Sequence, residues 1–464
     1  MRAMASNNCS KTAPPAPRIF KSLLTALLAF LVMICGLAWG HAAYAIPAFA
    51  QQTGQPCSQC HVGAFGPQLK PYARDFKLFG YVNGDKKNHL PPIAIIGLTS
   101  FNRTSAEQDS PPAPHYATND NFTLDQLSLL YGGKLAGGAG TFAEVTYDGV
   151  RRTFTIDNLD VKRAVYRDIG DRHILVGLDL NNRPTVQDLW NSTPTWGFPY
   201  NASALAPTPS NRVILDGALA QRVIGAGLYA MWDDLLYTEF NAYSPIDNRT
   251  TGRLGLGTTA GTDAYTGVTP YWRVALQHDF DGHYLEVGGY GISARRFPGG
   301  DETAGTDKFT DVALDATYQY TKNPKHFVSA HATWIHEDEQ LDASRALVGS
   351  RASNHLDTVR GDLSYSYDNT WTPSVQLFRT TGSRDPLFFG GLDGNPDSEG
   401  YIVELAYVPF GKTGSPISWA NARFTVQWVG YTRFDGASEG ASRNDTLYVS
   451  TRFAFAPFGA FVQR

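Results

Sequence analysis

The sequence predicts a mainly β protein, an antiparallel β-barrel of about 16 strands that follows a small α-helical N-terminal segment. Three observations predict this class. Short runs of alternating apolar and polar residues recur from residue 93 to residue 464, and turn signals or long polar stretches separate them. After residue 45, no segment is long and apolar enough for a transmembrane helix, so any membrane insertion must use strands.

Residues 1–45 have the layout of a secretory signal peptide. Basic residues precede an apolar run from Leu23 to Trp39, and Ala43 and Ala45 are small residues at the two positions that a signal peptidase reads. We expect cleavage before Ile46, and the small-residue site disfavours the alternative of an uncleaved anchor. The exported chain then holds 35 Lys and Arg against 43 Asp and Glu, which argues against a nucleic-acid partner.

Only two cysteines, Cys57 and Cys60, remain after residue 45, so the exported chain is not a disulfide scaffold. With the next residue they form Cys57-Ser-Gln-Cys60-His61, the attachment pattern for haem c. Two thiols at this spacing can form thioethers with the two vinyl groups of one porphyrin, and His61 then lies beneath the iron as its proximal ligand. A thioredoxin-like redox pair would need a surrounding βαβ pattern, and a zinc site would need a second ligand pair. Because the sequence offers neither, we predict one covalent haem c in residues 46–92.

Residues 66–80 predict one short helix, with Pro71 in its first turn and Gly80 as its C-terminal stop. A segment of this size buries little core by itself, so the apolar face of the helix is expected to pack on the porphyrin, with packing on the barrel wall as an alternative. The residues of this face are Leu69, Tyr72, Ala73, Phe76 and Phe79.

The sixth iron ligand is left open by the sequence. The segment has no methionine, and His89 is the nearest histidine after His61, followed by His115 in a polar stretch. We name His89 as the candidate second metal ligand, with a barrel residue, water or an open position as alternatives. The structural alternative for His89 is an exposed residue in a polar linker.

The barrel prediction for residues 93–464 rests on strands with one apolar and one polar face, as expected when lipid lies outside and a wet or filled lumen inside. The pattern is clear in residues 312–320, 359–367 and 424–430, and the last strand is predicted at 447–455. Tight turns such as Asp281-Gly282 and 368–370 mix with long loops such as 244–270 and 382–400, an arrangement typical of outer-membrane barrels. A soluble periplasmic β-sandwich is the alternative, but it needs far fewer strands.

Taken together, these motifs resemble the cytochrome-porin fusions of outer membranes, a group that includes iron-oxidising outer-membrane cytochromes. The residues that carry the resemblance are Ile46 to Gly54, the Cys57-to-His61 motif, Pro67, Leu69, Pro71, Tyr72, Arg74, Phe76, Lys77, Gly80, Tyr81 and, inside the barrel, Asn181 to Trp196. The resemblance implies a single haem at the periplasmic mouth of a barrel of about 16 strands, held by Cys57, Cys60 and His61. It does not assign the sixth ligand.

The resemblance also implies a function and a place in the cell. The expected protein lies in the bacterial outer membrane and passes electrons from an extracellular donor, for which iron(II) is one candidate, to a periplasmic c-type cytochrome or another electron carrier. Outer-membrane lipid is the other expected partner. Two alternatives remain: a porin-type transport channel whose haem segment acts as a plug or redox sensor, and a haem enzyme with an open iron position.

Overall fold

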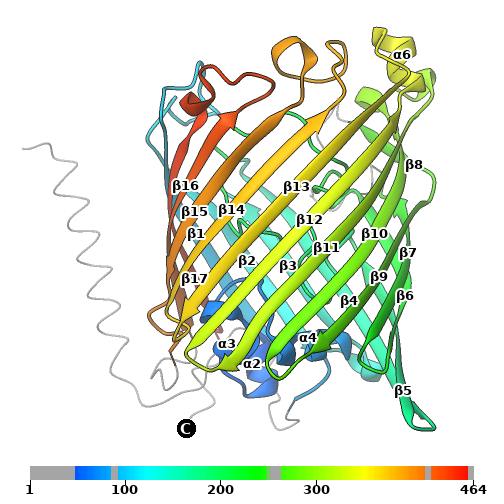
Figure 1. Ribbon diagram of the computed structural model, residues 1–464, viewed down its shortest axis with the longest axis vertical. Coiled ribbons are helices and arrows are strands. Elements are labelled where there is room, and N and C mark those ends of the chain that lie inside the picture. The colour runs from blue at the N-terminus through cyan, green and yellow to red at the C-terminus, as the bar shows by residue number, and fades with distance from the viewer. Residues whose placement is uncertain (1–47, 85–91, 248–249, 251–262, 413–419, 458–464) are drawn as a thin grey trace, which may run out of the picture. The chain divides into compact units, whose positions relative to one another are not determined.

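The computed structural model describes residues 48–84, 92–247, 250, 263–412 and 420–457, which all belong to the compact unit Ala43–Arg464. Within these residues, seventeen strands form one antiparallel sheet that closes on itself, because β1 (Ile93–Thr104) pairs with both β2 (Asn121–Lys134) and β17 (Thr446–Phe455) (Figure 1). β8 (Ala264–Thr266) and β9 (Thr269–Asp279) lie end to end along the same neighbour, so the barrel has 16 strand positions. The predicted fold class is confirmed.

The remaining strands are β3 (Gly140–Asp148), β4 (Thr153–Ile169), β5 (Arg172–Asn181), β6 (Val223–Trp232), β7 (Leu236–Pro245), β10 (His283–Phe297), β11 (Asp307–Asn323), β12 (His326–Gln340), β13 (Ser353–Tyr367), β14 (Trp371–Gly382), β15 (Ser398–Tyr407) and β16 (Ala420–Arg433). The α-helices are α2 (Ala48–Thr53), α3 (Cys57–Cys60), α4 (Pro71–Leu78) and α6 (Asp342–Val348). Short 3-10 turns occur at Val62–Ala64, Ala136–Gly138, Pro298–Gly300, Glu302–Ala304, Leu392–Gly394 and Ala441–Asn444.

The two faces of the wall differ as the alternation predicts. On β13, the Leu363 side chain is 49% exposed on the outside, whereas its neighbour Ser364 is fully buried on the inside. The predicted runs in β11 and β16 show the same separation, with apolar side chains outward and polar ones inward. Since successive side chains of a strand point to opposite faces, an apolar outer band follows.

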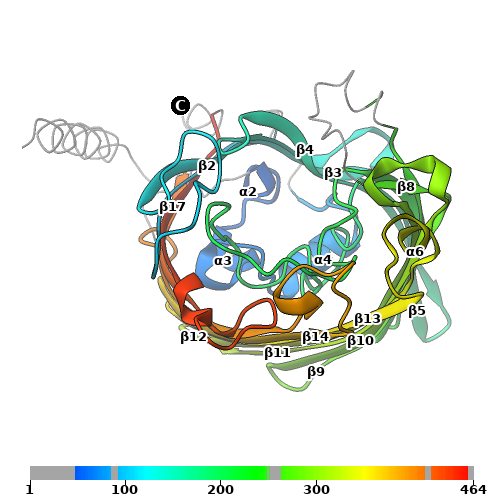
Figure 2. The ribbon, with the colours of Figure 1, turned by 90° about the horizontal axis from the view of Figure 1, so that it is seen from above.

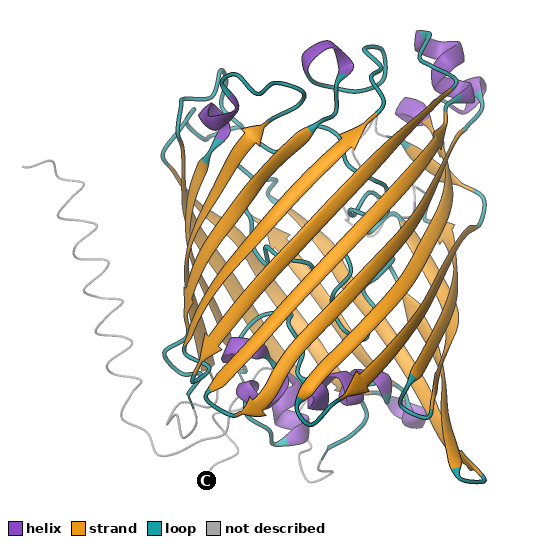
Figure 3. Cartoon of the chain, in the orientation of Figure 1, coloured by secondary structure: helices purple, strands orange, loops and turns teal. Residues whose placement is uncertain are grey.

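The two ends of the barrel differ in the length of their connections (Figure 3). The turns after β4, β6, β9, β11 and β13 have two or three residues, whereas the loops after β1, β5, β12, β14 and β16 have twelve or more. The predicted Asp281-Gly282 turn is confirmed, because both residues have positive φ, 56° and 83°. In outer-membrane barrels the short turns face the periplasm and the long loops face outward, which orients this chain.

Exposed aromatic side chains lie on the outside of the barrel near several short turns, for example Tyr166, Trp232 and Trp371. Tyr318 and Tyr365 each accept or donate a hydrogen bond with a histidine of the neighbouring strand, at 2.8 Å and 2.6 Å. A closed barrel with an apolar outer band and an aromatic border is the architecture of outer-membrane proteins. Among the helices that the structure describes, none is long and apolar enough to cross a membrane.

The helices α2, α3 and α4 lie within the ring of strands when the barrel is viewed along its axis (Figure 2), at the end that carries the short turns. The predicted helix over 66–80 is too long: α4 begins at Pro71 and ends at Leu78. Residues 68–70 are instead held extended, because Lys70 N donates to Cys60 O at 2.8 Å and Gln68 O accepts from Val62 N at 3.1 Å. Gly80 has a φ of 72° just after the helix, as its predicted role as a stop requires.

Candidate functional site

The cysteine motif forms a compact turn at the short-turn mouth of the barrel. Cys57 and Cys60 occupy the ends of α3, and His61 N closes the turn by donating to Cys57 O at 2.9 Å. A backbone bridge between His61 and Leu69 ties the turn to the start of α4. The structure thus brings Cys57, Cys60 and His61 together in one turn. Both thiols are free and half-buried.

The electrostatics of the two thiols differ from those of reactive redox cysteines. Burial raises the pKa of Cys57 to about 11 and, with a further contribution from Cys57, raises the pKa of Cys60 to about 12. Thiols that act in disulfide exchange have lowered pKa values, which keep them as thiolates. In the described part of the chain, no three His, Cys, Asp or Glu side chains converge as a metal site, so the pair has no second half of a zinc site.

The imidazole of His61 fits the role of a haem ligand. Its Nδ1 is buried without a hydrogen-bond partner among the described residues, and burial lowers the pKa of His61 to about 4. The ring is therefore neutral, which is the form that binds a metal. Two free thiols one turn apart and an adjoining neutral imidazole form the donor set that covalent haem attachment requires.

The apolar face of α4 packs largely on protein. Phe76 lies against Phe49 and Tyr81, with ring centroids 5.0 Å and 5.9 Å apart. Phe79 stacks on Tyr166 of β4 at 6.2 Å and contacts a buried cluster of the barrel wall. Phe79 therefore packs on the barrel wall, which the sequence analysis gave as the alternative to packing on the porphyrin. Phe76 packs inside the N-terminal segment (residues 48–84).

Three basic side chains, to which the sequence assigned no anchoring role, hold the N-terminal segment in place. Lys70, Arg74 and Lys77 follow one another at helical spacing, and this pattern could have predicted a basic face. Two of them donate to the barrel wall and its turns, Lys70 Nζ to Asn369 Oδ1 at 2.9 Å and Arg74 Nη1 to Gln319 Oε1 at 2.6 Å. Lys77 Nζ donates to Asn191 Oδ1 and to Val186 O, both at 2.8 Å, in the connection between β5 and β6. Burial, together with nearby Lys162, lowers the pKa of Lys77 to about 7.

Further contacts hold the segment on other sides of the ring. Asn421 of β16 donates to Ala64 O at 2.9 Å, and Arg423 donates to Phe65 O at 2.8 Å. Tyr81 donates to Asp160 of β4 at 2.5 Å. Since β4, β11 and β16 lie far apart in the strand order, the segment is fastened across the mouth and not at one edge.

The long connection between β5 and β6, residues 182–222, also runs inside the ring (Figure 2). Asp188 accepts from the backbone N of Ser192 and Thr193 at 2.9 Å and 3.0 Å. It lies 3.7 Å from Arg273, a fully buried side chain that also binds Asp315 of the wall at 2.8 Å. Because this loop supplies Asn191 and Val186 to Lys77, wall, loop and N-terminal segment form one connected network.

Of the other candidate ligands, His89 lies outside the described residues, as does the predicted signal peptide, residues 1–45. His115 is exposed in the long loop after β1, at the opposite end of the barrel from His61. Among the described candidates, only Cys57, Cys60 and His61 are assembled.

Comparison with known proteins concerns the fold alone. No protein-family model matches the chain, and no curated protein matches it. Solved structures with a similar fold include the anion-selective porin of Comamonas acidovorans, with 11% identity and a TM-score of 0.42 over 78% of this chain and 98% of the porin. OprB of Pseudomonas putida has 11% identity and a TM-score of 0.44 over 78% of this chain and 93% of OprB.

Proposed function

We propose that this chain is an outer-membrane c-type cytochrome that carries one covalent haem on Cys57, Cys60 and His61. It passes electrons from an extracellular donor, such as iron(II), to a periplasmic c-type cytochrome or another carrier. The observation that carries the proposal is the position of the cysteine motif, which is built into the periplasmic mouth of a closed barrel by contacts around the ring.

The residues of the site have different roles. Cys57 and Cys60 would fix the porphyrin, and the neutral imidazole of His61 would bind the iron from one side. A haem held there supplies reversible one-electron chemistry. The barrel spans the insulating hydrocarbon core, which is about 30 Å thick, and would hold this centre at its periplasmic mouth. The anchors at Lys70, Arg74 and Lys77 hold the segment in one orientation, which electron transfer to a docked carrier requires.

The first test asks whether the cofactor is present. Mass spectrometry and covalent haem staining of the purified protein should show one haem on a peptide that contains Cys57 and Cys60. The Cys57→Ser/Cys60→Ser variant should lose the added mass completely while its barrel still folds. A wild-type peptide without added mass, from cells that mature other c-type cytochromes, contradicts the proposal.

The second test asks in which direction electrons reach the site. Iron(II), supplied outside intact cells, should reduce the haem of the wild-type protein, as followed by its absorption bands. Cells that express Cys57→Ser/Cys60→Ser are the control for reduction by other cytochromes. A haem that external iron(II) or any other membrane-impermeant donor never reduces would remove the conduit function, although the haem site would stand.

A further inference from the structure

Two histidines and two aspartates form a square on the outside of the barrel near the long loops. His336 and Asp338 are outward residues of β12, and His355 and Asp357 are outward residues of β13. The strand register places His336 directly opposite Asp357, and Asp338 directly opposite His355. Each imidazole therefore has a carboxylate as its neighbour both along its own strand and across to the next.

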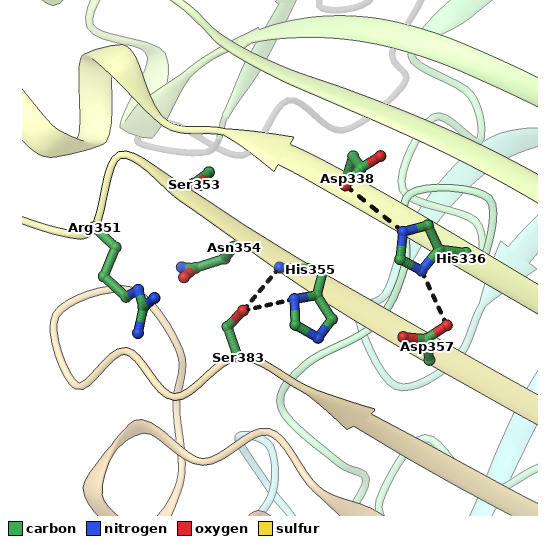
Figure 4. Close-up of a pocket in the computed structure, with 8 residues that line it drawn as sticks. All are labelled: His336, Asp338, Arg351, Ser353, Asn354, His355, Asp357 and Ser383. Carbon is green, nitrogen blue, oxygen red and sulfur yellow. Dashed lines mark hydrogen bonds and ion pairs between the residues drawn. The ribbon is translucent and has the colours of Figure 1, made fainter.

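The four side chains are close together (Figure 4). His336 Nδ1 lies 3.0 Å from Asp357 Oδ1, and His336 Nε2 lies 3.6 Å from Asp338 Oδ1. His355 Nδ1 shares a hydrogen bond of 2.9 Å with Ser383 Oγ. These residues line a cavity of about 380 Å³, and the Asp338 side chain is 70% exposed, so ions in the medium can reach the group.

The separation of the two imidazoles suits a shared metal ion. Because a zinc–nitrogen bond is about 2.0–2.1 Å long and a ring nitrogen lies ~1 Å from the ring centre, two imidazoles on one ion have centres roughly 6 Å apart or less. The ring centroids of His336 and His355 are 6.1 Å apart, and the rings are stacked with 27° between their planes, so the distance suits one ion but the rings must turn before both can bind it. The ions that accept imidazole and carboxylate together are divalent transition metals.

The side chains that line the cavity favour a cation as the ligand. Asp338 and Asp357 supply two carboxylates, and Arg351 is the one basic side chain in the described lining apart from the histidines. These carboxylates would attract a divalent cation. We propose that His336, His355, Asp338 and Asp357 form an extracellular binding site for a divalent transition-metal ion, independent of the haem site.

Binding requires a local rearrangement. No three ligand groups in the described residues already converge on one point, because His336 is engaged with Asp357 and His355 with Ser383. The metal replaces these hydrogen bonds once the two rings turn toward each other. Two strands of the closed barrel fix the backbone positions, so only side-chain rotation is needed.

The test uses the full-length protein in detergent, with Zn²⁺ titrated by calorimetry and Co²⁺ followed by visible absorption. Wild type should bind one ion at this site, and His336→Ala/His355→Ala should weaken binding by on the order of 100-fold or more. The matched control is His283→Ala/His326→Ala, which removes two outward histidines that bond to tyrosines near the opposite end. This control should bind as wild type does.

Two further measurements make the result decisive. Asp338→Asn/Asp357→Asn keeps the histidines and should weaken Zn²⁺ binding by about tenfold or more, with no change in the circular dichroism of the barrel. The Cys57→Ser/Cys60→Ser protein should bind the ion unchanged, because the site lies apart from the thiols. Wild type without Zn²⁺ or Co²⁺ binding, or with binding that survives His336→Ala/His355→Ala, would show that the square consists only of cross-strand ion pairs.

Discussion

The outer and inner faces of the barrel wall are specified in different ways. On the outside, side chains such as Leu363 need only be apolar, because lipid is a solvent without fixed positions. On the inside, Arg273 is fully buried, and its charge is balanced by ion pairs with Asp315 at 2.8 Å and Glu286 at 3.0 Å. The outer face therefore tolerates exchange among apolar residues, whereas each inner residue is constrained by its specific polar partner. The N-terminal segment, which also depends on specific hydrogen bonds, resembles the inner face in this respect.

The largest expected effect tests the inner face. Arg273→Met leaves three carboxylates, Asp188, Glu286 and Asp315, without their cation in the lumen. Breaking a buried ion network in this way should lower the free energy of unfolding by about 3–5 kcal/mol. Urea unfolding in lipid vesicles measures this change. Arg379→Met, which removes an exposed partner of Glu399, is the control and should cost about 0–1 kcal/mol. Equal effects would contradict the distinction between the faces.

The outer face is tested by Leu363→Arg, a charge placed toward lipid in the middle of an apolar run. The expected loss is about 2–4 kcal/mol in the same unfolding assay. Leu363→Met keeps the apolar character and should cost less than about 1.5 kcal/mol. If Leu363→Arg were as stable as Leu363→Met, this side of β13 would not face lipid.

The attachment of the N-terminal segment is tested by Lys77→Met. The variant loses the hydrogen bond to Asn191 and leaves that buried side-chain oxygen without its donor, which should cost about 1–3 kcal/mol of local stability. Limited proteolysis should cut residues 48–84 faster, and single-channel conductance across a bilayer should rise. Lys325→Met, at an exposed turn, should leave both readouts unchanged. A wild-type barrel that already conducts like an open porin would favour the transport alternative.

The smallest effect concerns a single turn. Gly282 has a φ of 83°, and a Cβ added there would lie 2.9 Å from Lys322 Cβ. Gly282→Ala should therefore cost about 1–2 kcal/mol through the left-handed backbone, and more with the contact. Gly170→Ala, at a φ of 62° with open space around it, isolates the backbone contribution. Unfolding that is less affected by Gly282→Ala than by Gly170→Ala would contradict the close contact with Lys322.

The features that could be predicted from the sequence are local in origin. The alternation that separates Leu363 from Ser364 has a period of two residues, and the Asp281-Gly282 turn needs only two residues with positive φ. The cysteine motif likewise spans five adjacent positions, and the structure places its two thiols and its imidazole together.

What was missed depends on contacts that reach beyond one helix or strand. α4 begins at Pro71 and not at residue 66, because residues 68–70 pair with the cysteine turn. Lys77 donates a hydrogen bond to Asn191, which lies 114 positions away in the sequence. No local sequence pattern predicts that the loop after β5 folds into the barrel. The basic face of α4 was visible in the sequence, but its partners were not.

The contact between Ala64 and Asn421 spans 357 positions, and it links the first described segment to the penultimate strand. This contact can therefore form only after β16 has been added to the barrel, although Ala64 precedes every strand in the chain. Completion of the mouth of the barrel is thus a late event in folding, because the cysteine turn and the penultimate strand must both be present.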